Sequence, residues 1–120
     1  MIKSISIGNF RSIKDKITLD FSRSSRKKSN LPNYISVANM ELASTTVVYG
    51  ANASGKSNLL RAFKAIEFLA LNSAKLDPDE GLGPYEPFRL SKGYEKKPVN
   101  IELEFFIENV RYNYSLVFTK

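Results

Sequence analysis

The octapeptide GANASGKS at residues 50–57 most constrains what this chain can fold into. It fits the pattern G-x-x-x-x-G-K-[ST], whose glycine-bounded loop wraps the phosphates of a nucleotide. Residues 45–49 before it are β-branched and end in an aromatic, which is typical of a buried strand. Residues 58–71 after it lack glycine and proline and favour helix. Because strand, loop and helix form the context that this motif requires, the sequence predicts a nucleotide-phosphate site.

The residue types in the loop suit an anion. Glycines at both ends let the backbone turn tightly and approach a phosphate. Backbone amides converge on the phosphate oxygens, and the helix adds its positive dipole end. Lys56 supplies charge for the β- and γ-phosphates, and the Ser57 hydroxyl is a ligand for Mg²⁺. The predicted nucleotide-binding residues of the loop are Gly50, Asn52, Ala53, Ser54, Gly55, Lys56, Ser57 and Asn58.

A plain helix N-terminus is the alternative for this segment, with Ser57 as a cap and Lys56 in solvent. That alternative explains neither glycine. It also places a positive charge in the first turn, where the helix dipole opposes it.

Composition limits the chemistry further. With 120 residues, the chain forms at most one modest domain. It contains no cysteine and no histidine, which removes disulfides, thiolate metal sites and the commonest general base. Catalysis would therefore rely on Mg²⁺, lysine and carboxylates. No apolar run reaches membrane-spanning length and the N-terminus lacks a signal-peptide core, so we expect a cytoplasmic protein without membrane contact.

The net charge of +6 leaves a nucleic-acid partner open. A polar loop at residues 22–33 holds the densest positive patch, formed by Arg23, Arg26, Lys27 and Lys28. This loop either contacts DNA or an acidic partner, or is simply solvated. It contains no aromatic residue to stack on a base, which argues against sequence reading.

Apolar patterning predicts five further strands. Residues 2–10 and 16–21 read as antiparallel strands, and residues 34–37 as a short strand. Residues 99–118 read as a hairpin with its turn at Glu108-Asn109. Phe106 breaks the polar face of this hairpin, so we expect another layer or another chain to cover it.

The link between the first two strands carries Phe10 and Ile13, which we expect in the core, and Arg11. Arg11 reads more readily as a surface charge than as an arm aimed at phosphate. The helix after the loop is apolar on more than one face, so we expect it to pack between two layers. The Pro/Gly-rich loop at residues 75–98 excludes continuous helix or strand, and we expect Phe88 and Leu90 to anchor it.

The groups that hydrolyse a nucleotide are missing. A P-loop ATPase needs an apolar strand ending in Asp, and residues 17–20 and 105–108 match this poorly. There is no glutamine, and no Asn-Lys-x-Asp motif, which argues against a GTPase. A small P-loop kinase would need lid arginines and an acceptor site that we cannot locate. No catalytic residue is predicted within this chain, and we expect a fragment or one half of a split domain.

Two segments together resemble a known family. Residues 5–13 (ISIGNFRSI) and 50–60 (GANASGKSNLL) are similar to the start of ABC-type ATPase heads of the SMC–RecF class. Within that class, the chain looks most like bacterial AAA-type ATPases related to the overcoming-lysogenisation-defect nucleases and abortive-infection proteins. Pro87-Phe88 and the hairpin at residues 112–118 also look like that group.

The resemblance implies an α/β P-loop NTPase. Residues 1–120 would form a single partial ATPase domain, the N-terminal lobe of an ABC/SMC-like head, with antiparallel hairpins flanking a strand–P-loop–helix unit. Lys56 and Ser57 would bind ATP–Mg²⁺, and Arg11 would lie near the nucleotide. A C-terminal half would supply the Walker B, signature and switch-histidine groups, and two heads would sandwich ATP.

These observations lead to two functional hypotheses. The first is an ATP–Mg²⁺-binding lobe that dimerises and acts in DNA maintenance or phage defence. The second is a non-hydrolysing module that binds nucleotide or nucleic-acid phosphate. The downstream reading frame would discriminate them, since an apolar run ending in Asp-Glu would identify the ATPase.

Overall fold

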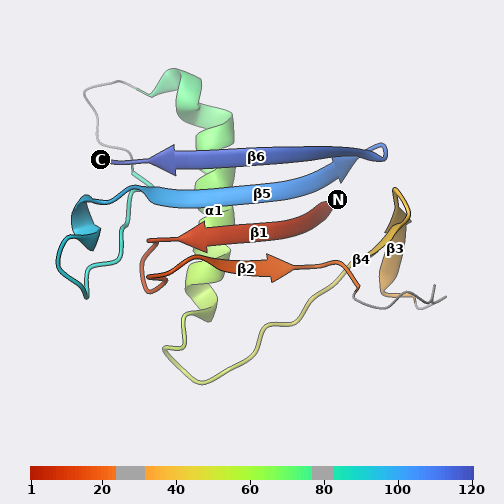
Figure 1. The fold of residues 1–120 in the computed structure, drawn as a ribbon, viewed down its shortest axis with the longest axis horizontal. Helices are drawn as coiled ribbons and strands as arrows, with labels where there is room; N and C mark the ends of the chain where they lie inside the picture. The colour runs from red at the N-terminus through yellow and green to blue at the C-terminus, as the bar shows by residue number, and fades with distance from the viewer. Residues whose placement is uncertain (24–31, 77–82) are drawn as a thin grey trace.

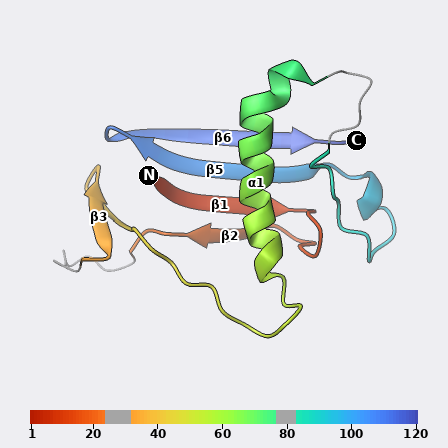
Figure 2. The same ribbon diagram turned by 180° about the vertical axis from the view of Figure 1, so that it is seen from behind.

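The computed structural model describes residues 1–23, 32–76 and 83–120. An antiparallel four-stranded sheet forms its centre, in the order β2-β1-β5-β6, and one helix crosses one face of it (Figures 1 and 2). A separate hairpin pairs β3 with β4. The elements are β1 (Ile2–Gly8), β2 (Ile17–Asp20), β3 (Tyr34–Val37), β4 (Met40–Ala43), α1 (Lys56–Asn72), β5 (Val99–Ile107) and β6 (Val110–Phe118), with short 3₁₀ turns at Ser73–Lys75 and Tyr94–Lys96.

The strands predicted at residues 2–10, 16–21, 34–37 and 99–118 are confirmed, although β1 ends at Gly8, and β4 was not predicted. In the sheet, β1 lies between β2 and β5. β1 pairs with β2 through Ile5 opposite Leu19, and with β5 through Ile7 opposite Ile101. The strands at the two ends of the chain, β1 with β2 and β5 with β6, therefore form one sheet. The turn at Glu108 and Asn109 has φ values of 48° and 65°, which is the left-handed geometry that a two-residue hairpin favours.

The core lies between this sheet and α1. The helix buries Ala62, Ala65, Ile66 and Leu69, at the spacing that puts them on one face. They pack against the buried sheet residues Ile5, Ile7, Val99 and Ile101, with Phe10 in the same cluster. Each fully buried aliphatic side chain contributes about 1.5–3 kcal/mol, so this interface holds the helix in place.

The prediction that α1 packs between two layers is wrong for the described residues. Leu71 is 70% exposed and Phe68 is 40% exposed, so neither side chain is covered by a second layer. The stripe of buried residues packs against the sheet, and Leu59 and Phe63 pack against the same core as partly buried neighbours. Phe106, by contrast, is 4% exposed within this chain, so it needs no other chain to cover it.

The Asn9 side chain is hydrogen-bonded to the backbone of residues 88–98 and holds this segment in place. Its side-chain amide donates to the carbonyls of Tyr94, Lys97 and Pro98, and its oxygen accepts from the Phe88 amide. Asn9 is buried at a φ of 52°, a conformation that asparagine tolerates better than most residues. Phe88 is buried as expected, whereas Leu90 is exposed and does not anchor the loop.

The β3–β4 hairpin attaches to the sheet through residues 21–23. The Ala43 amide donates to the Phe21 carbonyl, and the Arg23 amide to the Glu41 carbonyl. The Arg23 guanidinium pairs with Glu41 at 3.3 Å and lies over the Tyr34 ring. Of the predicted basic patch, Arg23 is thus engaged within the chain, and Arg26, Lys27 and Lys28 lie outside the described residues.

The sheet face that carries Ser4 and Glu104 is polar. Glu104 lies at its middle, where its carboxylate accepts from Lys3 Nζ at 2.7 Å and from the Ser4 hydroxyl, and pairs with Arg111. Burial acts to raise the pKa of Glu104, but Lys3, Ser4 and Arg111 outweigh it and hold the pKa below its ordinary value. Glu104 therefore stays ionised and ties β1, β5 and β6 together.

Candidate nucleotide-binding site

The loop at residues 50–55 requires glycine at Gly55 and is tightly packed at Gly50. Gly55 is the N-cap of α1 and has a φ of 95°, in the left-handed region that strains other residues. A Cβ at Gly55 would lie 3.1 Å from the Ser12 hydroxyl, and one at Gly50 would lie 3.1 Å from the Ser54 hydroxyl. The backbone therefore passes close to its neighbours at both ends of the loop, as a phosphate cradle requires.

Lys56 folds back over the same loop. Its Nζ donates to the carbonyl of Gly50 at 2.8 Å and to that of Ala51 at 2.6 Å, with Ser54 Oγ at 3.4 Å. These neutral partners orient the ammonium without cancelling its charge. A positive charge is thus held at the loop, next to the start of the helix.

The positive end of the α1 dipole is not neutralised by any side chain of its first turn. No side chain caps it, and its first turn contains no acidic residue. The first amides of a helix lack partners within the helix and carry the positive end of its dipole. Ser57, in this first turn, is exposed. The loop, Lys56 and the helix end therefore provide a site for a negatively charged group.

Arg11 and Ser12 hold the helix start against the β1–β2 connection. Arg11 Nε donates to Asn58 Oδ1 at 2.8 Å, and Asn58 Nδ2 lies 2.7 Å from the Ser12 hydroxyl. Both ends of the Asn58 side chain are thus engaged by the chain itself. The Asn58 backbone amide donates to the Gly55 carbonyl at 2.9 Å, so Asn58 positions the start of the helix with both its side chain and its backbone.

Arg11 is anchored a second time by Glu86. The Arg11 amide donates to the Glu86 carbonyl at 2.7 Å, and the two side chains form an ion pair. Partial burial, and next the nearby Arg61, lower the pKa of Arg11 from its ordinary value. Arg11 therefore contacts Asn58, the residue after Ser57, and links α1 to the segment at residues 83–86. The expectation of a free surface charge is wrong.

A cleft of about 500 Å³ opens beside the loop. The β1–β2 connection lines one side of it, and the loop with the segment before it lines the other. Residues that contribute to its wall include Ser12, Ile13, Asp15, Tyr49, Lys56 and Leu59. Its size falls within the range of sites that hold small molecules.

The prediction of a buried strand at residues 45–49 is wrong for this structure. These residues form no strand, and Tyr49 is 90% exposed. A strand is stable only when its backbone pairs with a neighbour, and no described strand lies alongside this segment. Residues 45–49 instead approach the loop as an extended, unpaired segment that contributes Val48 and Tyr49 to the cleft.

Three residues of this region were missed by the sequence reasoning. Asn9 and Ser12 had a usable signal, since polar residues flanking Phe10 in a tight turn favour left-handed or capping geometry. Glu86 had none, because its contact with Arg11 spans 75 positions of sequence and depends on the tertiary fold.

Residues 1–23, 32–76 and 83–120 contain no cluster of acidic, histidine or cysteine residues able to hold a metal ion by themselves. Within the same ranges, no helix is long and apolar enough to cross a membrane.

Comparison with protein families decides the class. The model described as "AAA domain, putative AbiEii toxin, Type IV TA system" matches residues 45–120. The chain belongs to this AAA domain family. The match includes the loop, α1 and the β5–β6 hairpin, so this α/β chain is a nucleotide-binding, ATPase-like P-loop domain. A search of curated proteins found no match.

Proposed function

We propose that this chain is the ATP–Mg²⁺-binding lobe of an ABC/SMC-like ATPase that acts in DNA maintenance or phage defence. One observation supports it above the others: Lys56 is held on the Gly50 and Ala51 carbonyls beside an uncapped helix N-terminus. The family description, which names a putative toxin of a toxin–antitoxin system, is loosely consistent with a role in defence.

The residues present fit such a ligand. The phosphates would lie against the backbone amides of residues 52–57, where a Cβ at Gly55 would be strained. Lys56 would share its ammonium with the β- and γ-phosphates, and the exposed Ser57 hydroxyl would ligate Mg²⁺. The metal, when bound, would neutralise charge on the phosphates. The nucleoside would occupy the 500 Å³ cleft between Ile13 and Tyr49.

Arg11 would act on this site through Asn58. Its guanidinium is paired with Glu86 and bonded to Asn58, so it holds the first turn of α1 rather than reaching for the ligand. This assigns Arg11 a positioning role near the nucleotide.

Hydrolysis would require groups supplied from outside this lobe. A C-terminal half of the same head would bring the acidic residue that orients Mg²⁺, and a second head would close over the ATP. The extended, unpaired segment at residues 45–49 is consistent with a lobe that gains neighbours in the assembled head.

The test is the affinity of the chain for ATP–Mg²⁺ by isothermal titration calorimetry, with Lys56→Ala as the variant. Loss of a charge-assisted contact should weaken binding by about tenfold or more. Lys92→Ala, an exposed lysine far from the loop in sequence, is the matched control and should bind as the parent chain does. Unchanged affinity in Lys56→Ala would sink the proposal.

A DNA titration at two salt concentrations separates the alternative of a non-hydrolysing module for nucleic-acid phosphate. DNA binding that survives Lys56→Ala but collapses when Arg26, Lys27 and Lys28 are replaced would favour that module. Under our proposal, ATP binding depends on Lys56 and is indifferent to those three residues.

A further inference from the structure

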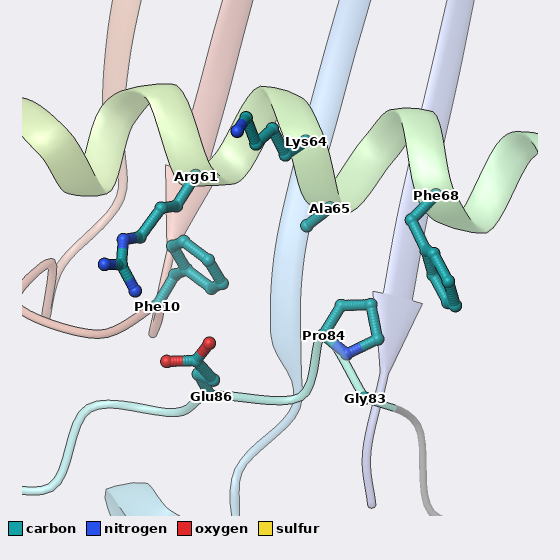
Figure 3. Close-up of a pocket in the computed structure, with 8 residues that line it drawn as sticks. All are labelled: Phe10, Arg61, Lys64, Ala65, Phe68, Gly83, Pro84 and Glu86. Carbon is teal, nitrogen blue, oxygen red and sulfur yellow. The ribbon is translucent and has the colours of Figure 1, made fainter.

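A second cleft, of about 280 Å³, lies between α1 and residues 83–86 (Figure 3). The helix contributes Arg61, Lys64, Ala65 and Phe68, which recur on one side of it at three- and four-residue spacing. Phe10, Gly83, Pro84 and Glu86 line the opposite side. None of the residues predicted to bind the nucleotide lines this cleft.

The cleft carries an excess of positive charge. Arg61 and Lys64 form no ion pair within the described part of the chain, and Figure 3 shows Arg61 directed toward the opposite wall. Glu86 is the one carboxylate of the wall, and its charge is already offset by Arg11. Arg61 is therefore a cation available to an anionic group inside the cleft, and Figure 3 shows the Lys64 ammonium lying along the helix, away from the opposite wall.

The same cleft has an apolar half. Phe68 is 40% exposed and Figure 3 shows its ring directed to the side where Pro84 lies. Phe10, at 2% exposure, and Ala65 form a rigid apolar floor between the charged and apolar halves. A half-exposed aromatic ring beside unpaired cations favours a ligand that combines a negative charge with an apolar group.

We propose that this cleft binds an acidic peptide segment of a partner protein. A carboxylate of the peptide would bind Arg61, with Lys64 at the edge of the cleft adding attraction, and a neighbouring apolar side chain would pack on Phe68 and Pro84. The charge of the chain, +6 overall, attracts such a segment and steers its approach. This inference is independent of nucleotide binding at the P-loop.

Single-stranded nucleic acid fits the cleft less well. The Glu86 carboxylate can accept a hydrogen bond from a peptide N–H, a donor that the phosphodiester backbone lacks. Nucleic acid also binds through several stacked bases, and only one lining aromatic, Phe68, is exposed enough to stack. The volume suits one or two side chains rather than a whole cofactor.

Fluorescence polarisation with a labelled hexapeptide of alternating Glu and Phe, added to the 120-residue chain, tests the proposal. The Arg61→Glu/Lys64→Glu variant should bind about tenfold or more weakly, because two attractions become repulsions. Phe68→Ser should also weaken binding. The matched control is Arg89→Glu/Lys92→Glu, which changes the net charge equally at exposed positions outside the cleft. Circular dichroism verifies that each variant is folded.

Three outcomes would overturn the proposal. The first is an equal loss in the Arg89/Lys92 control, which would mean non-specific attraction to a basic chain. The second is binding of the matched peptide with Gln in place of Glu at the same strength, or no binding of the acidic peptide at all. The third is a single-stranded oligothymidylate that binds this cleft more tightly than the peptide and is lost in Arg61→Glu/Lys64→Glu.

Discussion

Gly55 is the residue at which the loop, the helix and the β1–β2 connection meet. It ends the phosphate-binding motif, caps α1 and leaves 3.1 Å between its missing Cβ and Ser12. The motif in the sequence required a glycine here for the anion. The structure adds a second reason, because the hydrogen bond between Asn58 and Ser12 holds the β1–β2 connection close to the start of the helix.

Gly55→Ala should lower the free energy of unfolding by about 1–3 kcal/mol, through left-handed strain and the contact with Ser12. Gly93→Ala is a matched control, because Gly93 has a φ of 84° but nothing within 4 Å of its added Cβ. Urea denaturation should show the larger loss at Gly55. Adding Ser12→Ala to Gly55→Ala should recover part of that loss, and the absence of any recovery would argue against the contact.

Most strands could be predicted from the sequence, whereas the conformation of residues 45–49 could not. Alternation, loose in residues 2–10 and clear in residues 99–118, predicted β1, β5 and β6, and the turn at Glu108-Asn109 follows from local chemistry. Residues 45–49 have equal strand propensity but form no strand, because propensity cannot replace a pairing partner. The tether from Glu86 to Arg11 and the one-sided burial of α1 depend on tertiary contacts that no local pattern records.

Substitutions in the unpaired segment test this difference. Val47→Ala should change the free energy of unfolding of the chain by less than about 0.5 kcal/mol, as for an exposed surface site. Val99→Ala on β5, where the side chain is fully buried, should cost about 1–3 kcal/mol. Thermal unfolding compares the two. A large loss at Val47 would indicate that residues 45–49 are paired and buried after all.

The Glu104 cluster makes the sheet sensitive to acid. The pKa of Glu104 is lower in the folded chain than its ordinary value of 4.5. The contribution of Glu104 to stability is therefore present above pH 4.5 and is lost as the pH falls through the pKa of the folded chain. Glu104→Gln should therefore flatten the decline of stability with acid. Glu102→Gln, on the same strand but more exposed, is the control and should keep the decline. Urea midpoints across the acid range measure both.

At the scale of the whole molecule, one antiparallel sheet and one helix present a phosphate-binding loop at one end of the helix and a mixed charged and apolar cleft along its flank (Figures 2 and 3). β1 and Arg11 connect these features, because the turn after β1 contacts both the helix start and Glu86. The motif in the sequence could predict the loop, since its chemistry is local. The flank cleft joins residues 10, 61–68 and 83–86, so only the fold could reveal it.

The most direct test of the central claim is a titration of the chain with ATP–Mg²⁺, followed residue by residue through backbone amide chemical shifts. We expect the largest shifts on residues 50–58, with smaller ones along the 500 Å³ cleft at Ile13 and Tyr49. The same titration on Lys56→Ala should leave these amides unmoved at equal ligand concentration. Shifts centred on Arg61 and Lys64, or spread evenly over the basic surface, would contradict the assignment of the P-loop as the nucleotide site.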